Sequence, residues 1–294
     1  MSAWNRFWFG PASPLPLGLF RIGLGLAFLA YLYQITAPFE EFLGTRGIVA
    51  PATIEAILPQ PRLNLLPAGT PDAIMRLALF VFWVAALMLT IGYRTRLATF
   101  ACFALMCSFT QRNPFLLNGP EQLLRIYSFS FLLAPGNLPF SVDRRLAGLH
   151  WPPGPVIPLA QRLIALQVAI VYLAGVLWKT GGSRWVDGTA VYYTDQFETL
   201  KNHWLPLPLP SLEVVNLATY LTIAVELAIA LCAWFRPTRP WVLAGGVLLH
   251  LGIGWNMNLW IFSFAMLAGY PCFLAGRDVM AMTRSLGRWR VAWR

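Results

Sequence analysis

The chain has 294 residues, of which 57% are hydrophobic and only 12% are charged. A soluble globular domain averages roughly 25% charged residues, so a soluble fold is excluded and lipid must be the main solvent of this chain. The formal net charge of +10 indicates membrane topology rather than nucleic-acid binding, because the arginines gather in a few connecting segments.

The N-terminal segment is aromatic. It contains Trp4, Phe7, Trp8 and Phe9 with a single charge, Arg6. A cleavable signal peptide has a basic region followed by an apolar core, and neither is found here. We expect these rings to lie at the level of the lipid headgroups.

Eight apolar segments follow in the sequence. A helix rises ~1.5 Å per residue, so ~20 residues cross the ~30 Å hydrocarbon core. The third and fourth segments are short for this and would have to tilt or extend into 111–117. We predict an all-α, polytopic helical bundle with about eight transmembrane helices. The segments are 15–35, 73–93, 97–110, 122–134, 156–178, 214–235, 241–255 and 259–275.

Charge predicts the orientation of these segments. Cytoplasmic loops of membrane proteins are enriched in Lys and Arg. Eight spans would place both termini on the same side, and the arginine-rich connections predict that this side is the cytoplasm. The connections on that side would then hold Arg94, Arg96, Arg144, Arg145, Arg162, Arg236 and Arg239. The outer loops would hold most of the acids, namely Glu40, Glu41, Glu55, Asp72, Asp187, Asp195 and Glu198.

Two domains are expected, a membrane domain in residues 1–276 and a basic tail in residues 277–294. The tail contains arginines together with Trp289 and Trp293. We expect an amphipathic cytoplasmic helix that lies on anionic lipid. Two long segments, 36–71 and 181–211, are expected on the outer face. Functional sites are often built from long connections of this kind.

Charged side chains within the spans need an explanation, because each raises the free energy of membrane insertion by roughly 2.5–3.5 kcal/mol. Arg21 could snorkel to the cytoplasmic surface or pair with a buried acid such as Glu226. Glu226 and His250 lie on consecutive antiparallel helices at the same depth, ~15 Å from that surface. They could form a structural link between helices, or a pair that handles protons or contacts a ligand.

The outer end of the fourth segment carries a second candidate. Arg125 follows Glu121 by four residues, a spacing that suits an ion pair at a helix end. Arg125 is also the residue we expect to stabilise an anion at the outer face.

Lys179 ends the fifth segment, and the chain has only one other lysine, Lys201. Arginine stays protonated under almost any condition, whereas a buried lysine can lose its proton. Position alone fits a lysine that snorkels to the interface. The functional alternative rests on its neighbours, because Trp178 precedes it and Trp185 and Asp187 follow, which brings a counter-ion close.

Polar residues of other segments should gather at the same outer layer. Arg125, Asn256 and Asn258 are expected there, and Asn256 could either bind a ligand headgroup or cap a helix. The three histidines, His150, His203 and His250, are expected on both faces and in mid-membrane. We therefore expect no metal site.

The sequence resembles the HTTM (horizontally transferred transmembrane) domain family, whose best-characterised members are the vitamin K-dependent γ-carboxylases. Residues 13–24 resemble its opening helix, 89–94 the exit of its second span, and 122–143, ending Phe140-Ser-Val-Asp143, its fourth helix and turn. Residues 225–228 and 250–267 are similar to its last helices. The strongest piece is a set of residues at the family's spacing, Tyr172, Ala174, Gly175, Lys179, Trp185, Gly188 and Ala190.

The resemblance implies roles for these residues. In the carboxylases, a lysine at the place of Lys179 is regarded as the base that deprotonates reduced vitamin K. The cofactor would be a reduced, vitamin K-like quinone, with Trp178 and Trp185 as pocket walls and Tyr172 and Asn256 beside it. Glu226 and His250 also match family positions.

The sequence departs from the carboxylases in one motif. They use a histidine near the start of the fourth helix, where this chain has 118–121, Asn-Gly-Pro-Glu. They also carry a large lumenal domain that this sequence does not show.

Three functions therefore stay open. The first is a quinol-dependent, carboxylase-like enzyme. The second is a non-catalytic membrane protein in the maturation, export or immunity of a secreted partner peptide. The third is a lipid- or solute-handling protein in which Glu226 and His250 form a proton relay. The near-absence of lysine suggests a GC-rich bacterium, and hence a multi-pass protein of the inner membrane.

Overall fold

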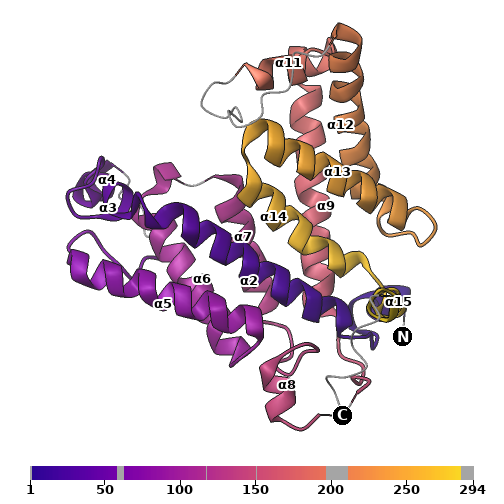
Figure 1. The fold of residues 1–294 in the computed structure, drawn as a ribbon, viewed down its shortest axis with the longest axis horizontal. Coiled ribbons are helices and arrows are strands. Elements are labelled where there is room, and N and C mark those ends of the chain that lie inside the picture. Colours follow the sequence, from indigo (N-terminus) through magenta and orange to yellow (C-terminus); the bar gives the residue numbers. More distant parts are fainter. Residues whose placement is uncertain (1, 58–62, 117, 150, 197–210, 286–294) are drawn as a thin grey trace. The chain divides into compact units, whose positions relative to one another are not determined.

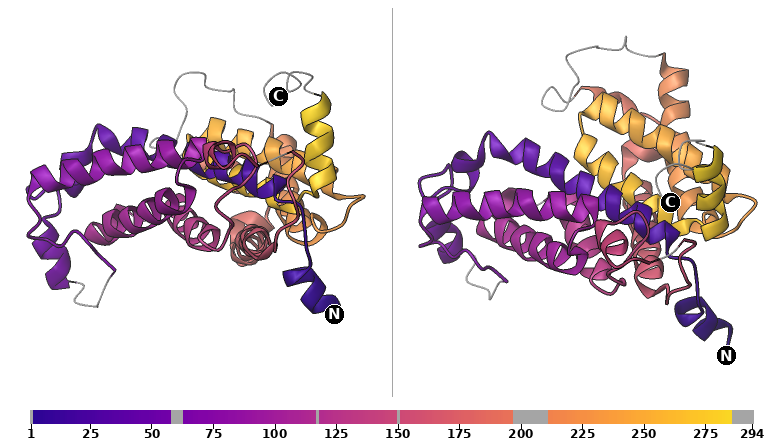
Figure 2. Two further views of the ribbon diagram at one scale, coloured as in Figure 1. Left: turned by 90° about the horizontal axis from the view of Figure 1, so that it is seen from below. Right: turned by 60° about the horizontal axis from the view of Figure 1, so that its bottom comes forward.

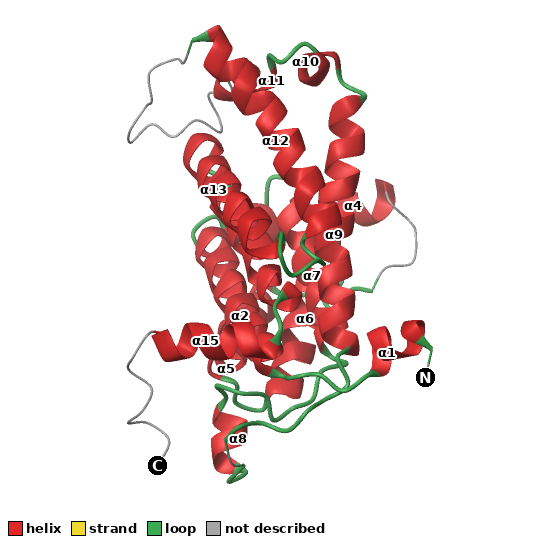
Figure 3. Cartoon of the chain, turned by 90° about the vertical axis from the view of Figure 1, so that its right-hand side faces the viewer, coloured by secondary structure: helices red, strands yellow, loops and turns green. Residues whose placement is uncertain are grey.

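The computed structural model describes residues 2–57, 63–116, 118–149, 151–196 and 211–285. Within these residues the chain is helical, with no strand beyond an antiparallel bridge between Ala12 and Val156 (Figure 3). The all-α class is therefore confirmed. Lys201, His150, His203 and the tail beyond Ser285 lie outside the described residues.

Each of the eight predicted apolar segments is a helix. Their bounds differ from the predicted ones by a few residues at most ends. The helices are α2 (Leu15–Thr36), α5 (Asp72–Ile91), α6 (Thr95–Arg112), α7 (Gly119–Phe131), α9 (Leu159–Thr180), α12 (Leu212–Cys232), α13 (Arg239–Met257) and α14 (Trp260–Gly269), which η2 (Tyr270–Phe273) continues.

Four of these helices, α2, α5, α9 and α12, are long and apolar enough to cross a membrane. The stretch Trp260–Phe273 is a shorter apolar helix. The count of eight spans and the cytoplasmic position of both termini stay predictions. The remaining elements are short: α1 (Ala3–Phe9), α3 (Phe39–Leu43), α4 (Pro51–Ile57), η1 (Pro114–Leu116), α8 (Val142–Leu146), α10 (Ser183–Val186), α11 (Ala190–Asp195) and α15 (Gly276–Ser285).

The chain divides into two compact units. Unit 1 comprises residues 1–164 and 274–294, and unit 2 comprises residues 165–273. In unit 1, α2 and α5 run side by side (Figure 2). Gly25 permits this packing, because a Cβ there would lie 2.3 Å from Oγ1 of Thr90.

Arg21 ties α2 to the end of α5. Its guanidinium donates hydrogen bonds to the carbonyl oxygens of Leu89, Thr90 and Phe140, at 2.5–2.7 Å. The last carbonyls of a helix have no partner within the helix, and Arg21 supplies donors for those of α5. Arg21 is 0% exposed. The prediction that it snorkels to the surface is therefore wrong, and its hydrogen-bond partners are carbonyls rather than Glu226.

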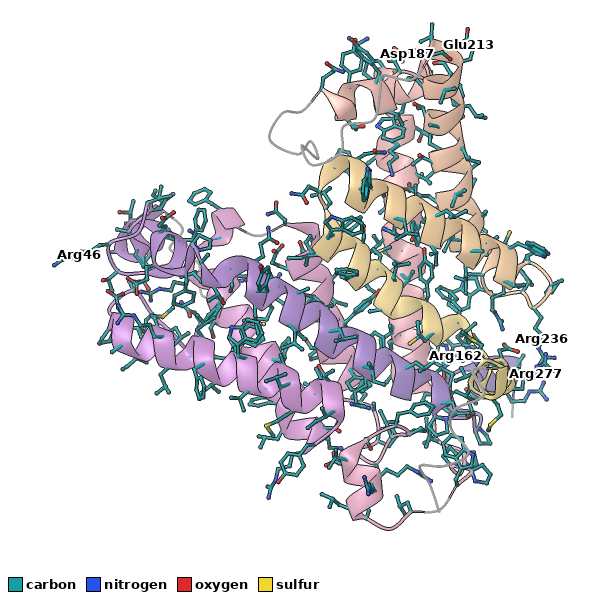
Figure 4. The ribbon with its side chains drawn as sticks, viewed as in Figure 1. Arg46, Arg162, Asp187, Glu213, Arg236 and Arg277 are labelled. Atoms are coloured by element: carbon teal, nitrogen blue, oxygen red, sulfur yellow. The ribbon has the colours of Figure 1, made fainter. Side chains whose placement is uncertain are left out.

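Arginines lie at both ends of unit 1. Figure 4 shows Arg162 and Arg277 at one end and Arg46 at the other. Helix α15, which begins the predicted basic tail, packs on α2. The tail is thus helical as far as Ser285, whereas Trp289 and Trp293 lie outside the described residues.

Unit 2 contains most of α9 together with α12, α13 and α14 (Figure 1). Helix α12 packs on α13, and α13 packs on α14. Asp187 and Glu213 lie at one end of this unit and Arg236 at the other (Figure 4). The orientation of these two ends across a membrane stays a prediction.

Candidate functional site

A cavity of about 700 Å³ lies within unit 2. Side chains from α9, α12, α13 and α14 line it, and most are apolar, such as Leu221, Val225 and Leu248. We call it the Lys179 cavity. Its ionisable lining residues include Lys179, Glu226 and His250. A mostly apolar cavity with a few polar groups is the usual form of a small-molecule site.

Lys179 and Glu226 form an ion pair in the wall of this cavity. Nζ of Lys179 donates to both carboxylate oxygens of Glu226. The Glu226 residue is 6% exposed, and the contact with Lys179 offsets the cost of burying a charged carboxylate. Lys179 therefore directs its side chain to a buried acid, and the prediction of a lysine that snorkels to the interface is wrong.

The surroundings of the pair leave its polar groups accessible from the cavity. Gly175 lies one turn before Lys179, and a Cβ there would be 3.4 Å from Oε2 of Glu226 and 3.6 Å from Nζ of Lys179. A longer side chain at Gly175 would displace the pair. Nζ also lies 5.1 Å from the centre of the Trp185 ring, within the range of a cation–π contact.

A second polar cluster surrounds His250. The hydroxyl of Tyr172 lies 2.7 Å from Nε2 of His250 and 2.5 Å from the hydroxyl of Tyr270. Ser263 donates to the backbone carbonyl of His250 at 2.8 Å. The His250 residue is 1% exposed, and its Nδ1 has no hydrogen-bond partner among the described residues.

The direct Glu226–His250 pair expected from helical depth is not found. Glu226 pairs with Lys179, and His250 pairs with Tyr172. Equal depth places two residues at one level, but the rotation of each helix decides which partner a side chain meets.

Sequence reasoning missed Tyr270. Its hydroxyl reaches Tyr172 because Gly246 leaves room on α13, where a Cβ would lie 2.1 Å from that hydroxyl oxygen. A tyrosine within an apolar segment could have indicated this contact, because a buried tyrosine hydroxyl needs a hydrogen-bond partner.

The residues predicted as pocket walls border two different hollows. Trp185 and Asn256 line the Lys179 cavity, as does Tyr172. Trp178 is 85% exposed and borders a separate hollow with Gly181 and Gly182. Adjacent helical residues point about 100° apart, so Trp178 cannot share the face that carries Gly175 and Lys179.

Arg125 belongs to unit 1 and is not a lining residue of the cavity. Its guanidinium lies 3.4 Å from the hydroxyl of Thr110. Glu121 instead caps the start of α7, where its carboxylate accepts from the backbone N–H of Asn118 at 3.0 Å. The predicted Glu121–Arg125 ion pair is therefore replaced by these contacts, and the role of Arg125 towards an anion stays a prediction.

Asp187 is not the counter-ion of Lys179. It accepts hydrogen bonds from the backbone N–H and the hydroxyl of Thr189, which hold the pKa of the Asp187 carboxyl below its usual value. Gly188 has a φ of 81°, a conformation that favours glycine. Asp187, Gly188 and Thr189 thus build a turn, which Tyr220 of α12 supports through a hydrogen bond to the carbonyl of Val186.

Comparison with known proteins identifies the family. The profile of the HTTM domain matches residues 9–277. The chain belongs to the HTTM domain family. The uncharacterized protein YitO of Bacillus subtilis (strain 168) is similar, with 27% identity over 266 residues, covering 78% of this chain and 83% of YitO. No solved structure gives a significant match.

Family and helices together establish the coarse function. This HTTM protein is a membrane protein of the γ-carboxylase-related family, and it has a bacterial relative. Among the described residues, no group of three or more His, Cys, Asp or Glu side chains could hold a metal ion.

Proposed function

We propose that this HTTM protein is a quinol-dependent, carboxylase-like enzyme of the bacterial inner membrane, with Lys179 as its base. The observation that carries the proposal is the position of the Lys179–Glu226 pair in the wall of a large apolar cavity. A secreted peptide or protein would be the substrate partner.

The cavity suits a reduced quinone. A quinol has a flat, apolar ring with polar oxygens, and a cavity of about 700 Å³ with apolar walls and two polar clusters matches that character. When bound, the quinol would supply an acidic hydroxyl group. Trp185 and Asn256 would contact the ring and its substituents from the lining.

Lys179 would take the proton. In its neutral form, Nζ uses its lone pair to form an N–H bond with the hydroxyl proton of the bound molecule. Glu226 then holds the resulting ammonium group through both carboxylate oxygens, in the arrangement that the structure describes. A base of this kind contributes about 100- to 10,000-fold to a rate. The apolar lining excludes water, which strengthens the interaction between ammonium and carboxylate.

The structure gives less support to the relay of protons through a direct Glu226–His250 contact, because each residue has another partner. The non-catalytic alternative makes the opposite prediction for Lys179, and the same experiment decides between it and the enzyme.

The test is turnover of a reduced menaquinone by the purified protein in nanodiscs, with carbon dioxide, oxygen and glutamate-containing peptides present. Lys179→Ala and Lys179→Arg should each lower quinol consumption at least about 100-fold. Arginine keeps the charge but cannot act as a neutral base. Lys201→Ala, which removes the other lysine, is the control and should keep the wild-type rate. Wild-type turnover in both Lys179 variants would contradict the base role and support a non-catalytic protein.

A further inference from the structure

His250 lines the Lys179 cavity and has a buried ring nitrogen without a hydrogen-bond partner among the described residues. The residue is 1% exposed, and this nitrogen is Nδ1. Polar groups that are buried in proteins nearly always have a partner, so this nitrogen calls for an explanation. The ring itself is well held, because Phe262 packs edge-on at 5.6 Å between ring centres and Tyr172 binds Nε2.

The two tyrosine hydroxyls decide where His250 carries its proton. A neutral imidazole has a proton on one nitrogen only. If Tyr270 donates to Tyr172 and Tyr172 donates to Nε2, both hydroxyl protons are used and the ring proton lies on Nδ1. In the reverse direction, Nε2–H donates to Tyr172 and Tyr172 donates to Tyr270.

The reverse direction leaves more polar groups unpaired. The hydroxyl proton of Tyr270 would then have no acceptor among the described residues, and Nδ1 would lack a donor. The first direction leaves only Nδ1–H unpaired. Because an unmet buried donor or acceptor is costly, the first direction is favoured, and Nδ1 is a hydrogen-bond donor.

We infer that His250 binds the ligand of the Lys179 cavity through a hydrogen bond from Nδ1–H to an acceptor oxygen, such as the carbonyl of a quinone or another apolar ketone. Tyr172 and Tyr270 are positioning residues that hold the tautomer of His250. The inference deepens the proposed function, since it concerns the same cavity, but it does not require Lys179 to be a base.

Binding of two matched probes tests this inference. One probe is a naphthoquinone with a single isoprene tail, and the other is 2-methylnaphthalene with the same tail, which has no carbonyl oxygen. Titrations use the protein in nanodiscs, with empty nanodiscs to correct for partition into lipid. Wild-type protein should bind the quinone at least about tenfold more tightly than the hydrocarbon.

His250→Phe keeps a ring but removes the donor. It should bind the quinone about tenfold more weakly than wild type and bind the hydrocarbon equally well, which also shows that the cavity is intact. Equal quinone affinity in wild type and His250→Phe would overturn the inference. So would equal affinity of wild type for the two probes. Turnover of Lys179 variants is a separate measurement, so failure of the base role leaves this result unaffected.

The tautomer can be observed directly. In a His150→Gln/His203→Gln background, His250 is the only histidine of the chain. Nitrogen NMR of ¹⁵N-histidine protein should show a protonated Nδ1 and an unprotonated Nε2. Tyr172→Phe should populate both tautomers and weaken quinone binding a few-fold, without changing hydrocarbon binding. A protonated Nε2 in the parent protein would overturn the proton arrangement on which the inference rests.

Discussion

Two basic side chains, Arg21 in unit 1 and Lys179 in unit 2, show two ways in which a protein uses a charge that is largely removed from water; Arg21 is buried and Lys179 is half-buried. Arg21 in unit 1 donates to three backbone carbonyls and is 0% exposed. Lys179 in unit 2 meets a single carboxylate and faces a cavity. The arginine is tied to the backbone and serves the fold, whereas the lysine has an ionisable partner and room for a ligand beside it.

Replacing Arg21 should have the largest effect on stability and so tests the comparison most strongly. Arg21→Met removes three hydrogen bonds to backbone carbonyls, and hydrogen bonds to charged groups contribute about 1.5–3 kcal/mol each. We expect a loss of about 5 kcal/mol in the free energy of unfolding, measured by thermal unfolding in detergent. Arg46→Met at an exposed position is the control and should change stability little. A small effect of Arg21→Met would mean that the arginine is not the structural counterpart of Lys179.

Removing Lys179 alone should have a smaller effect on stability. Lys179→Met leaves Glu226 buried without a partner, and breaking a buried pair costs about 3–5 kcal/mol unless the acid takes a proton. Adding Glu226→Leu should restore most of that stability, because the unpaired charge is removed. Unfolding temperatures of the single and double variants measure this coupling. No recovery in the double variant would show that the pair is not a unit.

A substitution at a glycine should disturb the polar cluster of His250, Tyr172 and Tyr270 while leaving these three side chains in the chain. A Cβ at Gly246 would lie 2.1 Å from the Tyr270 hydroxyl, whereas one at Gly245 would lie 3.7 Å from the nearest atom. Gly246→Ala should therefore cost about 1–3 kcal/mol, as overpacking does. Gly245→Ala should be close to neutral. Equal unfolding temperatures for the two variants would contradict the close approach of η2 to α13.

Asp187 should give the smallest effect, and one that depends on pH. Its hydrogen bonds to Thr189 lower the pKa of its carboxyl in the folded state. The stabilising contribution is therefore complete above the unfolded value of ~3.9 and is lost as pH falls through the lower folded value. Asp187→Asn should lower the unfolding temperature slightly at pH 7 and not at all in strong acid. A pH-independent difference would count against this account.

The helices were predictable, but the site contacts were only partly so. Long apolar runs predict α2, α5, α9 and α12 from length and hydropathy alone. The rarity of lysine in the sequence drew attention to Lys179. The partner of Lys179 was not predictable in the same way. Depth along a helix follows from residue number, but helix rotation and tilt decide which side chains meet.

Two errors show the same limit. Glu226 and His250 were predicted at one depth but have different partners, and Trp178 adjoins Lys179 but points to another face. Tyr270 was missed because its contact depends on a close approach at Gly246, which no periodicity reveals.

The most direct test of the central claim is quinol turnover by the Lys179→Met/Glu226→Leu variant, measured beside its unfolding temperature. The account predicts a near-wild-type unfolding temperature with turnover lowered at least about 100-fold, because the fold no longer carries an unpaired charge but the base is gone. Wild-type turnover in this stable variant would contradict the claim that the pair is the proton acceptor of the cavity.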